Sequence, residues 1–178
     1  SGIATNTHKY ASKIERYPTK VLDTRKTTPN MRYFEKLAVR IGGGANHRMG
    51  LYDMIMLKDN HIDFAGGIHQ AITKANTYRK SLPQYLPIEI EVRDFDELEQ
   101  VLNTGQVDRI MLDNFTPEQT RKAVEKINKQ YEVESSGGIT FDTLVDYAAC
   151  GVDFISVGAL THQIKSLDLS LKARVIKG

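Results

Sequence analysis

The sequence has little of several features, and each shortage excludes a class of protein. It contains a single cysteine, Cys150, among 178 residues, so no internal disulfide can form and a disulfide-stapled secreted domain is excluded. No apolar run approaches the roughly 20 residues that a membrane-spanning helix needs, so no membrane partner is expected. Cys150 follows an apolar helical pattern and is expected to be a small packed side chain.

There is also little net charge. The 24 lysines and arginines against 22 aspartates and glutamates leave a formal charge of +2, with both signs interspersed. Such a surface offers no broad attraction for nucleic acid, which is therefore not expected as a partner. Any recognition of an anion must be local.

Several motifs and targeting segments are absent. The sequence has no Walker A pattern, no G-x-G-x-x-G, no cysteine pair suited to zinc and no H-E-x-x-H. It opens with Ser1 and Gly2, with neither an initiating methionine nor a charged-then-apolar signal segment. We therefore expect a cytoplasmic protein whose natural N-terminus lies upstream of this sequence.

The length fits one domain, and no linker or low-complexity segment divides it. Eight strand-helix units of about 30 residues each would need about 240 residues, so a complete eightfold barrel barely fits. Six or seven units fit comfortably.

Short β-rich runs alternate with amphipathic helical stretches. The expected strands are 21–22, 54–57, 88–92, 109–112, 131–134 and 154–157. The expected helices are 3–14, 31–41, 68–81, 96–103, 116–129 and 141–150. This alternation predicts an α/β protein with parallel strands joined by right-handed crossovers.

Two details refine this prediction. Thr116, Pro117 and Gln119 have the residue types of a capping box with proline in the first helical turn. Apolar runs such as Ile110-Met111-Leu112 predict strands that are buried on both faces. The pattern leaves open whether the segment before the second strand forms an extra strand or a short helix.

Polar side chains collect after the expected strands, where parallel sheets and barrels carry their chemistry. The basic set follows the first two strands and comprises Arg25, Lys26, Arg48 and Lys58, with His47 as a candidate fifth member. The planar guanidinium suits bidentate binding of carboxylate or phosphate, and lysine adds a compact charge. A ligand with several negative charges is predicted, although any one of these residues alone is more often a surface cation paired with a neighbour.

The acidic pair, Glu91 and Asp113, ends two consecutive strands. Because adjacent strands lie about 4.8 Å apart, the two carboxylates are placed to share a hard cation such as Mg²⁺. The alternative is a salt bridge to Lys58 or Arg48, and the two interpretations are compatible.

Two glycine turns follow the last two strands. They are Ser136-Gly137-Gly138 and Ser156-Val157-Gly158. Glycine lets backbone N–H groups approach a phosphate closely, and a following helix start adds partial positive charge. A simple turn is the alternative for each of them taken alone.

Together and in order, the motifs resemble those of the quinolinate phosphoribosyltransferase family, also called carboxylating nicotinate-nucleotide pyrophosphorylases. The resemblance runs from about residue 1 to residue 171. The motifs are Asp23-Thr24-Arg25-Lys26-Thr27, Gly42-Gly43-Gly44, Asn46-His47-Arg48, Gly50-Leu51, Leu57-Lys58-Asp59-Asn60-His61, Glu89-Ile90-Glu91-Val92, Leu112-Asp113-Asn114, Glu134-Ser135-Ser136-Gly137-Gly138-Ile139 and Gly158-Ala159-Leu160-Thr161-His162.

The resemblance implies an incomplete (open) TIM-like β/α barrel with six or seven parallel strands, forming one catalytic domain over residues 1–178. It implies a pentosyltransferase that converts quinolinate and phosphoribosyl pyrophosphate to nicotinate mononucleotide, pyrophosphate and CO₂ in NAD biosynthesis, with Mg²⁺ as cofactor. The implied substrate-binding residues are Thr24, Arg25, Lys26, His47, Arg48, Lys58, Glu91, Asp113, Ser136, Gly137, Gly138, Ser156, Val157 and Gly158.

By this resemblance the basic set, apart from Lys26, holds the two quinolinate carboxylates, with His47 assisting. Lys26 sits beside the pyrophosphate. The acidic pair meets the ribose hydroxyls and Mg²⁺, through substrate or water, and the two glycine turns hold the 5-phosphate. The implied catalytic residues are Lys26, Lys58, Glu91 and Asp113.

The sequence departs from the family pattern in two ways. Asn30 stands where the family usually has glycine, and the family's N-terminal domain, which supplies an arginine to the neighbouring subunit's site, is absent. The resemblance therefore implies a homodimer or higher homo-oligomer and an incomplete site in this chain alone. Two alternatives stay open: a homologue with a different acceptor, such as the molybdenum-transport-associated relatives, and an inactive fragment that only binds phosphate or a partner subunit.

Overall fold

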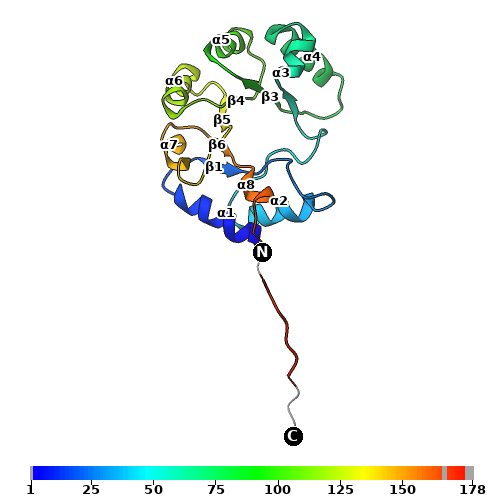
Figure 1. The fold of residues 1–178 in the computed structure, drawn as a ribbon. Coiled ribbons are helices and arrows are strands. Elements are labelled where there is room, and N and C mark those ends of the chain that lie inside the picture. Colours follow the sequence, from blue (N-terminus) through cyan, green and yellow to red (C-terminus); the bar gives the residue numbers. More distant parts are fainter. Residues whose placement is uncertain (1, 166–167, 175–178) are drawn as a thin grey trace.

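The computed structural model describes residues 2–165 and 168–174. Six parallel strands form one open sheet in the order β1-β6-β5-β4-β3-β2, which is the predicted α/β class with the lower of the two expected strand numbers. Figure 1 shows the strands at the centre of the molecule with the helices arranged around them. The strands are β1 (Lys20–Leu22), β2 (Ile55–Leu57), β3 (Ile88–Val92), β4 (Arg109–Asp113), β5 (Glu132–Ser136) and β6 (Phe154–Ser156).

The helices follow most of the predicted ranges. At the start of α6, the Thr116 hydroxyl accepts a hydrogen bond from Gln119 N at 3.2 Å and the Gln119 side chain accepts one from Thr116 N at 2.8 Å, which confirms the predicted capping box. Among the described residues, no helix has the length and apolarity needed to cross a bilayer. The helices are α1 (Gly2–Lys13), α2 (Arg32–Ile41), α3 (Asp59–Ala65), α4 (Ile68–Lys80), α5 (Phe95–Thr104), α6 (Pro117–Ile127), α7 (Leu144–Ala148) and α8 (Ala159–His162).

Two helical predictions need correction. The expected helices leave out the polar stretch after β2, but this stretch begins α3, where His61 Nδ1 accepts a hydrogen bond from Lys58 N at 3.0 Å. Its apolar pattern is weak because Ile62 is its one buried residue. The helix expected over 141–150 is shorter, since α7 covers only Leu144–Ala148.

The strands have two buried faces of different character. In β3, Ile88, Ile90 and Val92 belong to the hydrophobic core formed with the helices, while Glu89 and Glu91 alternate with them and point into the barrel. All five residues of this strand are buried, as predicted, but the inner face is polar. This polar interior supplies the site described below.

The sheet is open between β1 and β2, and residues 42–54 cross the gap. This segment contains no helix or strand, only a single parallel bridge in which Ala45 N donates to Val21 O at 2.9 Å. A Cβ on Gly42 would lie 2.5 Å from the main-chain oxygen of Ala4, so only glycine lets the crossing chain pass α1 this closely. The question left open by the sequence is thereby answered: the segment carries functional side chains on an irregular backbone.

Candidate active site

A pocket of about 640 Å³ opens at the C-terminal ends of the strands. Every predicted substrate-binding residue except Val157 lines it. It also includes residues that sequence reasoning did not assign, among them Tyr10 from α1 and His162 from α8. His162 ends one of the family motifs but received no assigned role, and Tyr10 was expected only as part of the first helix. Their place in the pocket depends on α1 and α8 meeting in the fold.

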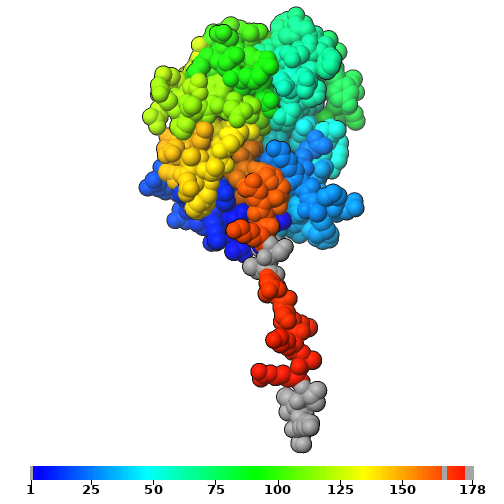
Figure 2. Space-filling model, in the orientation of Figure 1, coloured from blue at the N-terminus to red at the C-terminus, as the bar shows by residue number. Residues whose placement is uncertain are grey.

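The loop after β1 brings three of the predicted residues to one wall. Lys26 N donates to the Thr24 hydroxyl at 3.1 Å, which tightens the turn. The main-chain oxygen of Lys26 accepts a hydrogen bond from the Thr161 hydroxyl at 2.9 Å, so α8 holds this loop from the far end of the chain. Figure 2 shows α8, in orange, on the same face as the N-terminal helix, in blue.

Arg48 comes from the crossing segment and approaches Arg25 inside the pocket. Its guanidinium donates to Met54 O at 3.3 Å. Burial and the positive charge of Arg25 lower the Arg48 pKa from its ordinary value, although the group stays charged at neutral pH. Two cations at close quarters without a matching anion are unfavourable, so this wall is suited to an anionic ligand.

The acidic pair lines the same pocket from the ends of β3 and β4. Glu91 forms an ion pair with Lys58, which is the salt bridge considered as an alternative from the sequence. Burial and the negative charge of Glu91 raise the pKa of Asp113. The Asn114 amide donates to Asp113 at 2.8 Å and holds the carboxylate in place.

The first glycine turn is tied to the acidic pair through Asn114. Asn114 N donates to Ser136 O at 2.8 Å, and a Cβ on Gly137 would lie 2.2 Å from the Asn114 side-chain oxygen. Gly137 also has a φ of +95°, which favours glycine. The turn therefore brings its backbone to the pocket in one defined conformation.

The second glycine turn differs from expectation. Val157 is buried in the core and its N–H donates to Leu22 O at 2.9 Å, so neither its side chain nor its N–H faces the pocket. The Ser156 hydroxyl donates to Glu134 in the barrel interior. Gly158 does reach the pocket, where a Cβ would lie 2.6 Å from His162 Nε2. Val157 is thus removed from the set of direct ligands because sheet pairing uses its amide.

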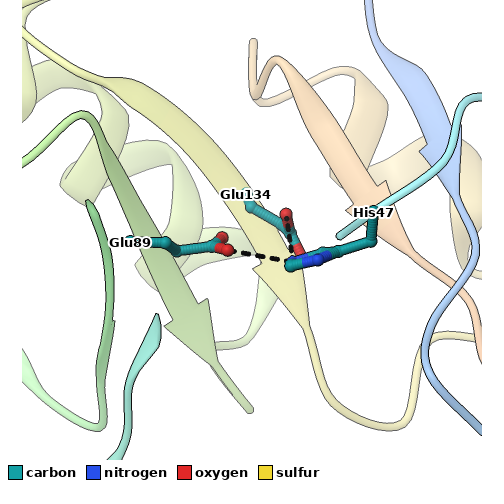
Figure 3. Close-up of side chains that lie close together, drawn as sticks. All are labelled: His47, Glu89 and Glu134. Carbon is teal, nitrogen blue, oxygen red and sulfur yellow. Dashed lines mark ion pairs between the residues drawn. The ribbon is translucent and has the colours of Figure 1, made fainter. Parts of the chain in front are cut away.

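Below the pocket, His47, Glu89 and Glu134 form the interior cluster (Figure 3). His47 Nε2 lies 2.9 Å from Glu89 and 3.6 Å from Glu134. Burial lowers the His47 pKa, which favours the neutral ring, while burial and the nearby Glu89 raise the pKa of Glu134 to about 8. The sequence placed both glutamates on strands, but nothing in it showed that they share one interior.

The ligand atoms of this cluster all lie within 4.8 Å of one another, a spacing compatible with a metal ion. The acidic pair offers the harder, pocket-facing oxygen atoms that Mg²⁺ prefers. The two sets are distinct, because the carboxylates of the interior cluster, Glu89 and Glu134, do not line the pocket, whereas both carboxylates of the acidic pair do.

Comparison with known proteins agrees with this architecture. The family model for the quinolinate phosphoribosyl transferase C-terminal domain matches residues 3–172. The chloroplastic nicotinate-nucleotide pyrophosphorylase [carboxylating] of Arabidopsis thaliana is 44% identical, over 97% of this chain and 53% of the relative. A probable enzyme of the same name from Bacillus subtilis is also 44% identical, over 96% of this chain and 58% of the relative.

Solved structures give the same result. The nicotinate-nucleotide pyrophosphorylase from Francisella tularensis superposes with a TM-score of 0.88 at 47% identity, covering 96% of this chain and 59% of that one. This chain thus spans a little over half the length of these relatives. By sequence match and by fold, the chain belongs to the quinolinate phosphoribosyltransferase family, in the part that forms its C-terminal domain.

Proposed function

We propose that the protein containing this chain transfers the phosphoribosyl group of phosphoribosyl pyrophosphate to quinolinate. The products are nicotinate mononucleotide, pyrophosphate and CO₂. One observation carries the proposal: a single pocket is lined by the basic set, by a carboxylate pair and by a glycine turn. Both substrates carry several negative charges. The net charge of the chain is only +2, so the compensating positive charge must come from the local basic set.

The basic wall suits the acceptor. Arg25 and Arg48 present two guanidinium groups, each able to bind a carboxylate through two hydrogen bonds, and quinolinate carries two neighbouring carboxylates. Lys58 adds a third positive charge beside Glu91. The repulsion between the two arginines is relieved when the dianion binds, so part of the binding free energy comes from charges already placed together.

Other residues of the same pocket suit the donor. We assign Lys26 to the pyrophosphate and the turn at Gly137 and Gly138 to the 5-phosphate, where its backbone approaches the ligand without a Cβ in the way. The acidic pair is assigned to the ribose hydroxyls. Asn114 connects these two regions and sets the distance between them.

The reaction follows from where the charges lie. As the bond from the anomeric carbon to pyrophosphate breaks, positive charge grows on the ribose ring and is stabilised by Glu91 and Asp113, while Lys26 stabilises the departing oxygens. The pyridine nitrogen, held by the basic wall, attacks the anomeric carbon. Once quaternary, that nitrogen carries a positive charge that stabilises the electron pair left on the neighbouring ring carbon when its carboxylate leaves as CO₂. A proton from water then forms the C–H bond at that carbon. The residues bind and orient, and no covalent nucleophile is needed.

Mg²⁺ is part of the proposal. Glu91 and Asp113 fit a hard cation because both are carboxylates at the pocket surface, where burial and then the negative charge of Glu91 raise the pKa of Asp113. When bound, the ion would neutralise phosphate charge on the donor. Lys58, already paired with Glu91, provides part of that compensation from the protein itself.

We further propose a homo-oligomer in which a neighbouring subunit completes the site, working in the cytoplasm. The support is an apolar surface on α2 and the crossing segment. Its side chains are more than half exposed, an unfavourable arrangement for large apolar groups unless they are covered. The members of this surface are Tyr33, Phe34, Ile41, Leu51 and Tyr52. Light scattering of the full-length protein and cell fractionation test these two points.

The function is tested with the full-length protein, quinolinate, phosphoribosyl pyrophosphate and Mg²⁺. We expect nicotinate mononucleotide, with one CO₂ and one pyrophosphate released for each turnover. Nicotinate, which has one carboxylate, serves as the control acceptor and should be used poorly because it cannot satisfy both arginines. Absence of nicotinate mononucleotide from the quinolinate reaction would refute the proposal.

A further inference from the structure

Charged groups that the proposed reaction does not use lie beneath the pocket. Glu89 and Glu134 point into the barrel from β3 and β5, and both are fully buried. Arg109, on the strand between them, donates to Glu134 at 3.1 Å and to Glu132 at 2.9 Å, and its guanidinium lies 4.0 Å from the centre of the Phe154 ring. Arg109 is therefore held on the Glu132 and Glu134 side.

Glu89 is near the Arg109 charge and has a further neighbour in His47. Within the described parts of the chain, neither of its carboxylate oxygens accepts a well-aligned hydrogen bond. A buried carboxylate without compensation is costly. The charge of Arg109 supplies part of that compensation, and His47 Nε2 approaches a Glu89 oxygen to 2.9 Å from the crossing segment, a close contact that is not aligned as a hydrogen bond.

The His47 ring is fixed from its other side as well. Nδ1 accepts a hydrogen bond from the main-chain N–H of Arg48 at 2.7 Å. An accepting Nδ1 carries no proton, so in the neutral ring Nε2 carries it, on the side of the ring near Glu89 and Glu134. The imidazole thus links a buried carboxylate on β3 to the backbone of Arg48 in the crossing segment.

We propose that Glu89 is a positioning residue for the acceptor: by fixing the His47 ring it fixes the Arg48 main chain, and with it the guanidinium that receives a quinolinate carboxylate. The inference rests on the proposed function and deepens it. Arg48 needs this support because it comes from an irregular segment without helix or strand pairing around it. Bidentate binding requires a guanidinium held in a narrow range of orientations.

The interior cluster could instead be a metal site, since its ligand atoms lie within 4.8 Å of one another. Arg109 argues for the positioning role, because its guanidinium already donates to the Glu134 carboxylate at 3.1 Å and supplies a positive charge there. The Ser156 hydroxyl also donates to Glu134. A metal ion would have to compete with both donors.

The first test is steady-state kinetics of Glu89→Gln in the full-length protein. We expect the KM for quinolinate to rise about tenfold, with the KM for phosphoribosyl pyrophosphate changed less than about twofold. The matched control is Glu132→Gln, which removes another Arg109-bound carboxylate that is half-exposed and outside the interior cluster. An unchanged quinolinate KM, or equal rises for both substrates, overturns the inference.

The second test needs no turnover and therefore separates this inference from the proposed function. The sequence has five histidines, so ¹⁵N spectra of the ring nitrogens are simple, and a His47→Gln spectrum assigns His47. We expect the Nε2–H tautomer in the unaltered protein and displaced His47 ring signals in Glu89→Gln but not in Glu132→Gln. An Nδ1–H tautomer, or a stoichiometric metal ion that elemental analysis finds lost in Glu89→Gln, overturns it. If Glu89→Gln does not fold, the His47 tautomer in the unaltered protein still tests the inference, because an Nδ1–H tautomer overturns it.

Discussion

Lys36 and Asp23 form an ion pair in which both side chains are completely buried, at 2.5 Å. The same carboxylate accepts hydrogen bonds from His47 N at 2.9 Å and from the Asn46 amide at 2.6 Å. Lys36 Nζ also donates to His47 O at 3.0 Å. One ion pair between β1 and α2 thus anchors the crossing segment that carries His47 and Arg48.

Lys36→Ala should therefore destabilise the protein strongly. It leaves the Asp23 charge buried without its partner, a change that typically costs about 3 to 5 kcal/mol. Denaturant unfolding measures the loss. The control is Lys122→Ala, which breaks an exposed ion pair with Glu118 on α6 and should change stability little. Similar losses in the two variants would contradict the anchoring role.

Arg48→Ala should weaken quinolinate binding much more than phosphoribosyl pyrophosphate binding. The variant removes a partly buried guanidinium on the acceptor wall, and a hydrogen bond to a charged group is typically worth about 1.5 to 3 kcal/mol. Equilibrium titration with each substrate separately measures the difference. Arg40→Ala, an exposed arginine at the end of α2, is the control. Equal losses for the two substrates would remove Arg48 from the acceptor wall.

Much of this pocket was predictable because the functional side chains of β/α barrels lie at the C-terminal ends of the strands. Alternation of strands and helices gave the parallel order, and residues after each strand then fell at one edge. Lys58, Glu91 and Asp113 lie together for this reason alone.

Other features depend on contacts that no local pattern encodes. Val157 follows a strand like its neighbours, yet pairing with Leu22 across the sheet consumes its N–H. Glu89 and Glu134 share one buried interior only because Arg109 and His47 reach them from other elements. Helix α3 was not predicted because its start is fixed by one side chain, His61, rather than by an apolar stripe.

Glu134 should make stability depend on pH. Burial and the nearby Glu89 raise its folded pKa to about 8, from an ordinary value of 4.5, so the folded protein holds a proton there that the unfolded chain releases. Its contribution to stability is present below about pH 4.5 and is lost as the pH rises through about 8. The free energy of unfolding should therefore decline with pH across this interval.

Glu134→Gln should remove that decline. Unfolding measured from pH 5 to 9 should show a flatter profile for the variant than for the unaltered protein, with the variant gaining relative stability at the alkaline end. Glu132→Gln, a half-exposed neighbour on the same strand, should keep the original slope. Parallel profiles for Glu134→Gln and the unaltered protein would place the Glu134 pKa in the ordinary range.

Gly137→Ala should disturb the proposed phosphate turn in two ways: through its backbone conformation and through a clash with a neighbouring side chain. Its φ of +95° disfavours alanine, and the new Cβ would also lie 2.2 Å from the Asn114 side-chain oxygen. Asn114 holds Asp113, so the clash should displace both the turn and the acidic pair. We expect weaker binding of phosphoribosyl pyrophosphate together with a loss of stability.

Gly66→Ala isolates the conformational part of that effect. Gly66 has the same φ of +95° at the end of α3, but nothing lies within 4 Å of its Cβ position. Its cost should be the left-handed backbone alone, about 1 to 2 kcal/mol, with substrate binding unchanged. The excess loss in Gly137→Ala then measures the contact with Asn114. If the two variants lose equal stability and both bind phosphoribosyl pyrophosphate normally, the turn does not hold the phosphate through this geometry.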